Sequence, residues 1–243
     1  MGSQDNQAPS AFEAVVFAGG GCRCFWQAGF WQEAAPALNL EPRVVAAASA
    51  GSAFACASIG GIGEQVVEDF IARASRNKSN VYPRNFLSRR PMFPHEEIYR
   101  RAVLSCEEQD TLEALHRGPE IRVALEHPTV EVGVHASLVA GLVAYKLERK
   151  LRKRVHVRWP ARLGFRPSVA TVRECTTPEQ LADLLLHSSC TPPVTSLLRR
   201  NGKIVIDAGI IDSVPVHLVE DADTQLVLLT RRYPADALPK VPG

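Results

Sequence analysis

Ser49 lies where a nucleophile could be placed on a tight turn between a strand and a helix. The surrounding stretch reads RVVAAASAGSAFA (residues 43–55), so a β-branched pair is followed almost entirely by small residues. A nucleophile elbow has the pattern G-x-S-x-G, because the turn is strained and side chains at its flanks would collide. Here residues 47–51 read AASAG, with Ala47 in place of the first glycine. Taken alone, the stretch is equally consistent with a buried helix of small residues.

Three consecutive glycines, Gly19, Gly20 and Gly21, follow one strand-like segment and precede a helix-like one. Backbone N–H groups converge at such a turn, and the helix dipole favours negative charge there. The dinucleotide fingerprint G-x-G-x-x-G fails, because Cys24 stands where its third glycine would be. No phosphate-binding G-x-x-x-x-G-K-[ST] motif is present either. The remaining use for these N–H groups is an oxyanion hole for an acyl-transfer intermediate.

Far downstream, a carboxylate ends another apolar segment. The stretch KIVIDAG (residues 203–209) places Asp207 at the end of a predicted buried strand, directly before Ala208 and Gly209. Burying a carboxylate is costly unless something hydrogen-bonds it. A buried aspartate with a raised pKa can serve as the base for a serine without a histidine. An aspartate before a glycine can also be part of a turn, so this alternative stays open.

The elements that would position these residues alternate between strands and helices. Their apolar patterns are those of buried strands, which indicates an α/β fold with a mostly parallel central sheet flanked by helices. We predict strands within 13–21, 43–47, 121–125, 130–137, 203–209 and 225–230, and helices over 24–38, 50–59, 64–76 and 178–187.

Composition is that of an ordinary globular protein. The chain has 243 residues, of which 46% are hydrophobic and 22% are charged, and its net charge is +2, which does not call for nucleic acid. The six cysteines are too sparse for a disulfide scaffold, and we expect thiols in a reducing compartment.

We predict one domain over 11–233, flanked by tails at 1–10 and 234–243. No segment predicts a signal peptide or a membrane span, and a cytoplasmic protein is expected.

In their order along the chain, the three motifs resemble those of the patatin-like phospholipases. That family's pattern is a GGGxRG loop, then GxSxG a few dozen residues later, and then DGG or DGA far downstream. This chain has GGGCRC at 19–24, AASAG at 47–51 and DAG at 207–209. The resemblance extends through 19–34 and 187–216, and it covers most of the chain. Three small residues depart from the pattern: Cys24, Ala47 and Ala208.

The resemblance implies a patatin-like three-layer architecture and hydrolysis of phospholipid or acylglycerol esters. Ser49 would be the nucleophile and Asp207 the base, and neither a metal nor an organic cofactor would be needed. The resemblance also implies an oxyanion hole in the backbone of Gly19, Gly20, Gly21 and Cys22. Further residues that would meet the substrate are Arg23, Ala50, Gly51 and Gly209.

Two alternatives to this hypothesis remain. A Ser-His-Asp esterase acting on small soluble esters would use His217, which lies ten residues after Asp207. A catalytically silent lipid-binding relative would keep the fold while Ala47 closes the elbow. Comparing the variants Asp207→Ala and His217→Ala would separate the first alternative from a Ser-Asp dyad.

Two clusters of basic residues indicate what kind of surface the protein could contact. Residues 73–94 carry six basic side chains and no acid, and residues 146–158 carry seven basic side chains against one acid. Such patches are typical of a peripheral contact with an anionic membrane surface, although a solvated helix face is the simpler interpretation. Nucleic-acid binding would fit the charge, but no binding motif accompanies it. The sequence does not indicate an oligomeric state.

Overall fold

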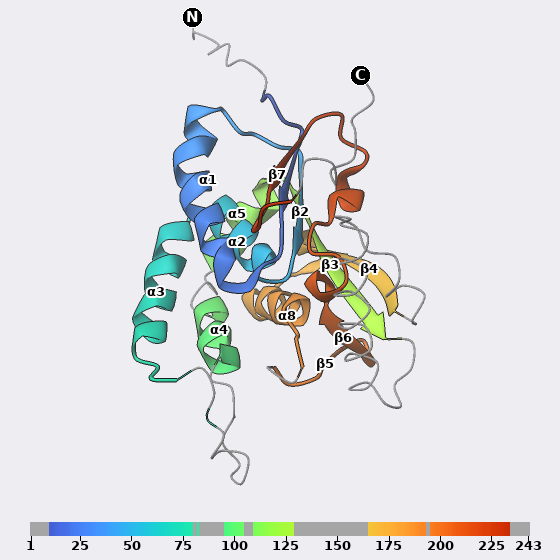
Figure 1. Cartoon of the computed structure of the whole chain (residues 1–243). Helices are drawn as coiled ribbons and strands as arrows, with labels where there is room; N and C mark the ends of the chain where they lie inside the picture. The colour runs from blue at the N-terminus through green and yellow to red at the C-terminus, as the bar shows by residue number, and fades with distance from the viewer. Residues whose placement is uncertain are drawn as a thin grey trace, which may run out of the picture.

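The centre of the fold is a mixed sheet (Figure 1). The computed structural model describes residues 10–79, 82, 95–104, 109–128, 165–192 and 195–233. Within these residues the sheet has seven strands: β1 (Ala14–Phe17), β2 (Val44–Ala48), β3 (Glu120–Pro128), β4 (Phe165–Thr171), β5 (Leu198–Arg200), β6 (Lys203–Asp207) and β7 (Gln225–Leu228).

Six α-helices and four short 3₁₀ helices are found in the same described ranges. The α-helices are α1 (Phe25–Ala37), α2 (Ala50–Ile59), α3 (Gly63–Ser75), α4 (His95–Leu104), α5 (Gln109–Arg117) and α8 (Pro178–Ser188). The 3₁₀ helices are η1 (Gly21–Cys24), η3 (Val172–Glu174), η4 (Ala208–Ile210) and η5 (Val216–Val219).

The strands follow the order β5-β6-β3-β2-β1-β7, with β4 paired to the other edge of β3. β7, β1, β2 and β3 run in one direction, whereas β4 and β6 are antiparallel to β3. The predicted fold class is confirmed, with the correction that the sheet is mixed where β6 and β4 join β3.

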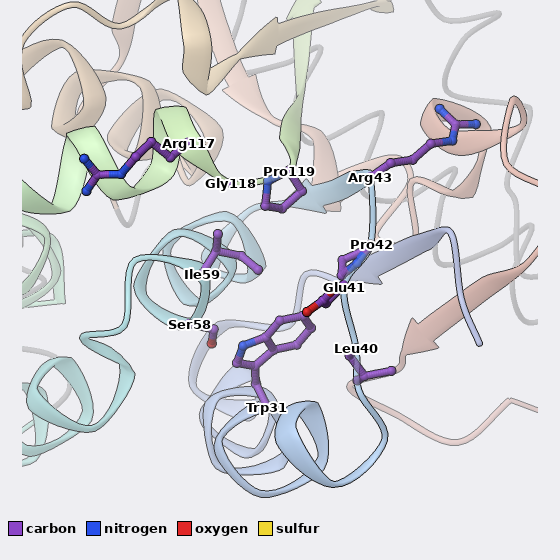
Figure 2. Close-up of a pocket in the computed structure, with 10 residues that line it drawn as sticks. All are labelled: Trp31, Leu40, Glu41, Pro42, Arg43, Ser58, Ile59, Arg117, Gly118 and Pro119. Carbon is purple, nitrogen blue, oxygen red and sulfur yellow. The ribbon is translucent and has the colours of Figure 1, made fainter. Parts of the chain in front are cut away.

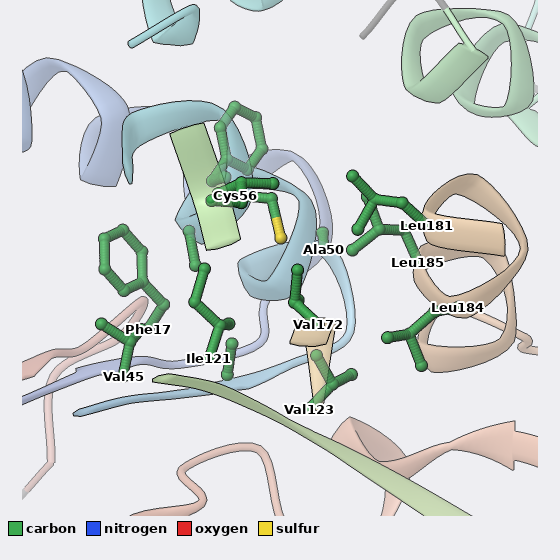
Figure 3. Close-up of a cluster of buried hydrophobic side chains, with 14 of the residues drawn as sticks. Phe17, Val45, Ala50, Cys56, Ile121, Val123, Val172, Leu181, Leu184 and Leu185 are labelled. Atoms are coloured by element: carbon green, nitrogen blue, oxygen red, sulfur yellow. The ribbon is translucent and has the colours of Figure 1, made fainter. Parts of the chain in front are cut away.

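Side chains alternate between the two faces of the central strands, and both faces are buried. One face packs under the helices, as Figure 3 shows for the larger apolar cluster. It carries Val15, Phe17, Val45, Ala47, Ile121, Val123 and Leu125. The opposite face is covered by the segment around η5, and its strand residues are Ala14, Val16, Val44, Ala46, Ala48 and Ala124. The sheet is therefore the middle layer of three.

Helix α2 lies in the centre of the helical layer and contacts α1, α3, α5 and α8. It is rich in small residues because it is enclosed on all sides: seven of its ten residues are buried. At its start, a Cβ on Gly51 would lie 2.6 Å from the carbonyl oxygen of Phe17 and 2.8 Å from that of Ala18. Only glycine therefore lets α2 begin this close to the end of β1.

Most of the predicted elements are confirmed, with boundaries within a few residues. The strands at 13–21, 43–47, 121–125, 203–209 and 225–230 correspond to β1, β2, β3, β6 and β7, and the four predicted helices correspond to α1, α2, α3 and α8. The predicted strand at 130–137 lies outside the described residues, as do both predicted tails apart from Ser10. In the described part of the chain, no helix is both long and apolar enough to cross a membrane.

Replacing Gly51 by alanine should destabilise the protein by about 3 kcal/mol or prevent folding, because the new Cβ would meet two backbone oxygens that cannot move aside. The matched control is Gly29→Ala, in the middle of α1, where no atom lies within 4 Å of the added Cβ. That change should stabilise the protein by roughly 0.5–1 kcal/mol through helix propensity. The free energy of unfolding in urea measures both, and equal stability of the two variants would contradict the packing argument.

Candidate active site

The strand β3 brings Ser49 and Asp207 together. β2 pairs with β3 as far as Ala48, which lies opposite Ala124, and Ser49 follows directly. β6 pairs with the next part of β3 from the opposite direction, so that Asp207 lies opposite Leu125. The two strands therefore end against each other at neighbouring positions on β3, although 158 residues separate the side chains that they carry.

Ser49 sits at the strained turn between β2 and α2. Its backbone has φ 55° and ψ −140°, a region that residues other than glycine rarely adopt, at a cost of about 1–3 kcal/mol. Its N–H donates to the Ser188 hydroxyl at 3.0 Å, and its carbonyl accepts from the Ser52 N–H at 2.9 Å. These two hydrogen bonds hold the turn. Strain at this point is typical of a nucleophile elbow, in which the side-chain oxygen is projected at a helix N-terminus.

The hydroxyl of Ser49 donates to Oδ2 of Asp207 at 2.5 Å. The same oxygen accepts from the Thr191 hydroxyl at 3.1 Å, and Oδ1 accepts from the Gly209 N–H at 2.6 Å. Both side chains are nearly enclosed, since Ser49 is 8% exposed and Asp207 is 7% exposed. The carboxylate is thus buried with three donors around it, and one of them is the serine.

Burial raises the pKa of Asp207 from 3.8 to about 6, because the charged form loses its hydration. The hydrogen bonds from Ser49, Gly209 and Thr191 oppose this effect, since each stabilises the carboxylate. The group is therefore mostly ionised at neutral pH and can still accept a proton, which is the requirement for a general base.

Ser188, at the end of α8, is a polar contact that the sequence motifs do not indicate. Its hydroxyl donates to the carbonyl of Ala124 at 3.3 Å and accepts from the N–H of Ser49. The Ser188 hydroxyl has one proton, which it donates to Ala124. In the contact with the Ser52 hydroxyl at 3.1 Å, Ser52 is therefore the donor and Ser188 the acceptor. α8 begins at a clear capping signal, with the Thr177 side chain accepting from Gln180. The last turn of α8 places Ser188 beside the turn that carries Ser49.

The glycine loop lies directly against Ser49. A Cβ on Gly19 would be 3.0 Å from the Cβ of Ser49, and a Cβ on Gly20 would lie 2.5 Å from the Thr230 hydroxyl. The N–H of Gly19 donates to the carbonyl of Ser213 at 2.8 Å, so the expectation that Gly19 contributes to an oxyanion hole is corrected. The N–H of Gly21 donates to no group in the described part of the chain, whereas the backbone of Gly20 hydrogen-bonds to the sulfur of Cys24.

The remaining predicted contacts occupy different positions. Gly209 belongs to the site, because a Cβ there would be 3.2 Å from the Cβ of Ser49. Ala50 and Gly51 form the buried first turn of α2. Cys22 and Arg23 lie in the exposed 3₁₀ helix that follows the glycine loop. The guanidinium of Arg23 forms no ion pair with any described residue.

No described histidine ring bonds to Ser49 or Asp207. His217 lies 3.5 Å from Asp212 instead. His127 bonds to Ile204 and Ser168, and the His187 ring bonds to the carbonyls of Asp183 and Arg199. In the described ranges no cluster of three His, Cys, Asp or Glu side chains could hold a metal ion, and the described cysteines are thiols.

A pocket of about 530 Å³ lies at the opposite end of the sheet (Figure 2). Its lining includes the residues that precede β2, Leu40 to Arg43, and those that precede β3, Gly118 and Pro119. Ser49 follows the other end of β2, so this pocket is separate from the Ser49–Asp207 pair.

Comparison with known families gives one result. The model of the family described as patatin-like phospholipase matches residues 15–219, a span that runs from β1 to the end of η5 and includes both Ser49 and Asp207. No curated protein matches the chain.

The buried carboxyl of Asp207 should make stability depend on pH. Its folded pKa of about 6 lies above the unfolded value of 3.8, so this group favours the folded state most below pH 4. The contribution should fall by roughly 2 kcal/mol as the pH rises from 4 to 7. The free energy of unfolding of the wild type, compared with Asp207→Asn at each pH, isolates this group from Glu126, whose pKa burial raises to about 7. A difference between the two proteins that does not change with pH would contradict the assignment.

Proposed function

The chain belongs to the patatin-like phospholipase family, and from this premise we propose that it hydrolyses lipid carboxylic esters through Ser49 and Asp207. Family membership supports lipid ester hydrolysis in general. The observation that carries the finer proposal is the 2.5 Å hydrogen bond from the Ser49 hydroxyl to Asp207, made at a strained elbow. A serine next to a base and at a helix N-terminus is the arrangement that activates a hydroxyl as a nucleophile.

In the first half of the reaction, Oγ of Ser49 attacks the acyl carbonyl carbon while its proton passes to Asp207. The tetrahedral intermediate then collapses, and the departing alcohol takes that proton from Asp207. In the second half, a water molecule gives its proton to the carboxylate and attacks the acyl-enzyme. The fatty acid is released, and the proton returns to Ser49.

The negative oxygen of each intermediate is stabilised by backbone N–H groups. The N–H of Gly19 donates to Ser213, so the donors in this proposal are the N–H groups of Gly20 and Gly21, which follow Gly19 in the loop that contacts Ser49. Gly21 has φ 59°, and this left-handed conformation suits glycine. Donors fixed by the backbone need no reorganisation during the reaction, which is why they stabilise an oxyanion well.

The lipid surface meets the protein beside the glycine loop. Trp26, in the first turn of α1, is 41% exposed, and its ring stacks edge-on against Phe30 at 5.7 Å. Arg23 lies one turn earlier with an exposed guanidinium. An amphipathic indole beside a cation is suited to the interface of an anionic bilayer. Of the two basic clusters, 146–158 lies outside the described residues, and 73–94 is described only as far as Ser79 and at Tyr82.

A fluorophosphonate probe should label the wild type at Ser49. Labelling should disappear in Ser49→Ala and fall by about 100-fold or more in Asp207→Asn, because the base is lost. The rate should rise with pH through the Asp207 pKa of about 6 and then level off. Ser58→Ala, at the far end of α2, is the matched control and should label normally. Absence of labelling in the folded wild type would overturn the enzyme proposal in favour of a silent lipid-binding relative.

The membrane contact is tested with the Ser49→Ala protein, so that vesicles are not hydrolysed. Trp26→Ala should weaken partitioning onto phosphatidylglycerol vesicles by roughly tenfold, through loss of buried aromatic area. Leu38→Ala is the matched control, because Leu38 is 52% exposed at the other end of α1. Equal partitioning of the two variants in a vesicle sedimentation assay would place the contact elsewhere on the protein.

A further inference from the structure

The pocket at the opposite end of the sheet has the size and walls of a small-molecule site. Its volume of about 530 Å³ falls within the range of known ligand pockets. The indole of Trp31 forms a wall, and its ring packs against the Phe17 ring with centroids 5.7 Å apart. The last turn of α2 closes the pocket with Ser58 and Ile59, as Figure 2 shows. Leu40, Pro42 and Pro119 complete the apolar lining.

Three polar groups in this lining have no side-chain partner among the described residues. The Ser58 hydroxyl is buried without any hydrogen bond. The carboxylate of Glu41 forms no ion pair, and the N–H of Trp31 donates no hydrogen bond, in the same part of the chain. Figure 2 shows the indole nitrogen turned toward Ser58 and the Glu41 carboxylate directed toward the other end of the ring. A pocket with apolar walls and a few unsatisfied polar groups is typical of a binding site.

The charges around the pocket favour a cation. Arg43 already pairs with Asp221 at 3.0 Å and Glu13 at 3.6 Å, and Arg117 lies 3.8 Å from Glu113. Both arginines belong to the lining and each already has an acidic partner, whereas the carboxylate of Glu41 pairs with no cation among the described residues.

The Trp31 indole and the C-terminal end of α2 also attract positive charge, as the Glu41 carboxylate does. The last turn of α2 presents the negative end of the helix dipole, which attracts positive charge. The face of an indole also attracts cations, and it does so more strongly than the face of any other side chain.

We propose that this pocket binds a small organic ammonium ion with an apolar body. The ammonium group pairs with Glu41 and lies over the Trp31 ring, while the apolar body covers Leu40 and Ile59. The site stands independently of the proposed hydrolysis, because α2, with ten residues, separates it from Ser49 by roughly 15 Å.

The test uses the folded Ser49→Ala protein, so that its outcome does not depend on catalysis. Titration with 2-phenylethylammonium should shift the indole N–H resonance of Trp31 saturably, with the resonance identified by its loss in Trp31→Phe. The neutral 2-phenylethanol and the anionic phenylacetate should bind at least fivefold more weakly, because each lacks the charge that Glu41 attracts.

Variants of the exposed Glu41 keep the test independent of folding. Glu41→Gln should weaken binding of the ammonium probe roughly fivefold, and Glu41→Lys should reverse the preference in favour of phenylacetate. Glu33→Gln, another exposed acid on the adjoining helix α1, is the matched control and should change binding less than twofold. Equal binding of the three probes, an equal effect of Glu41→Gln and Glu33→Gln, or no saturable shift up to the solubility of the probe would overturn the proposal.

Discussion

Strand β3 fixes the distance between the two chain segments that carry Ser49 and Asp207. β2 ends opposite Ala124 and β6 ends opposite Leu125, so both ladders terminate on the same edge of β3 at adjacent residues. A slip of one residue in either ladder would move its end by about 3.4 Å and turn its side chains to the other face of the sheet. A 2.5 Å hydrogen bond would not survive either change. The geometry of the pair therefore rests on backbone pairing, and the side chains only complete it.

The unfavourable features of the site are offset by hydrogen bonds from segments that are distant in the sequence. The strained backbone of Ser49 is held by Ser188, and the buried carboxylate of Asp207 is solvated by Thr191 and Gly209 in place of water. Ser188 also bonds to Ala124 on β3, so α8, the elbow and the sheet are joined at one hydroxyl. Such a fully bonded network makes the site rigid, because no member can move without leaving another unpaired.

Much of this arrangement could be predicted from the sequence, and the part that could not has physical causes. β1, β2, β6 and β7 are short apolar runs, and α2 is a run of small residues, so local pattern identified them. β4 contains Pro167 and is largely exposed in its middle, and α5 has only nine residues and is mostly polar, so neither has the apolar run by which the other elements were predicted. Asp207 and Ser49 were found by motif order. The role of Ser188 was not predicted, because it depends on the place where α8 ends. The N–H of Gly19 could not be excluded as an oxyanion donor from the sequence either, because its acceptor, the Ser213 carbonyl, lies far away in the chain.

The three departures from the family pattern follow from what surrounds each position. At the first elbow position, Ala47 points into the larger apolar cluster beneath the helices, where a methyl group is accommodated without disturbing β2. Cys24 and Ala208 are likewise buried among apolar residues. The second elbow position is different, because Gly51 faces two carbonyl oxygens at the end of β1. Of the two flanking positions of the elbow, only the second is therefore restricted to glycine by packing in this chain. Ser49 still adopts φ 55°, so the alanine at the first position does not close the turn.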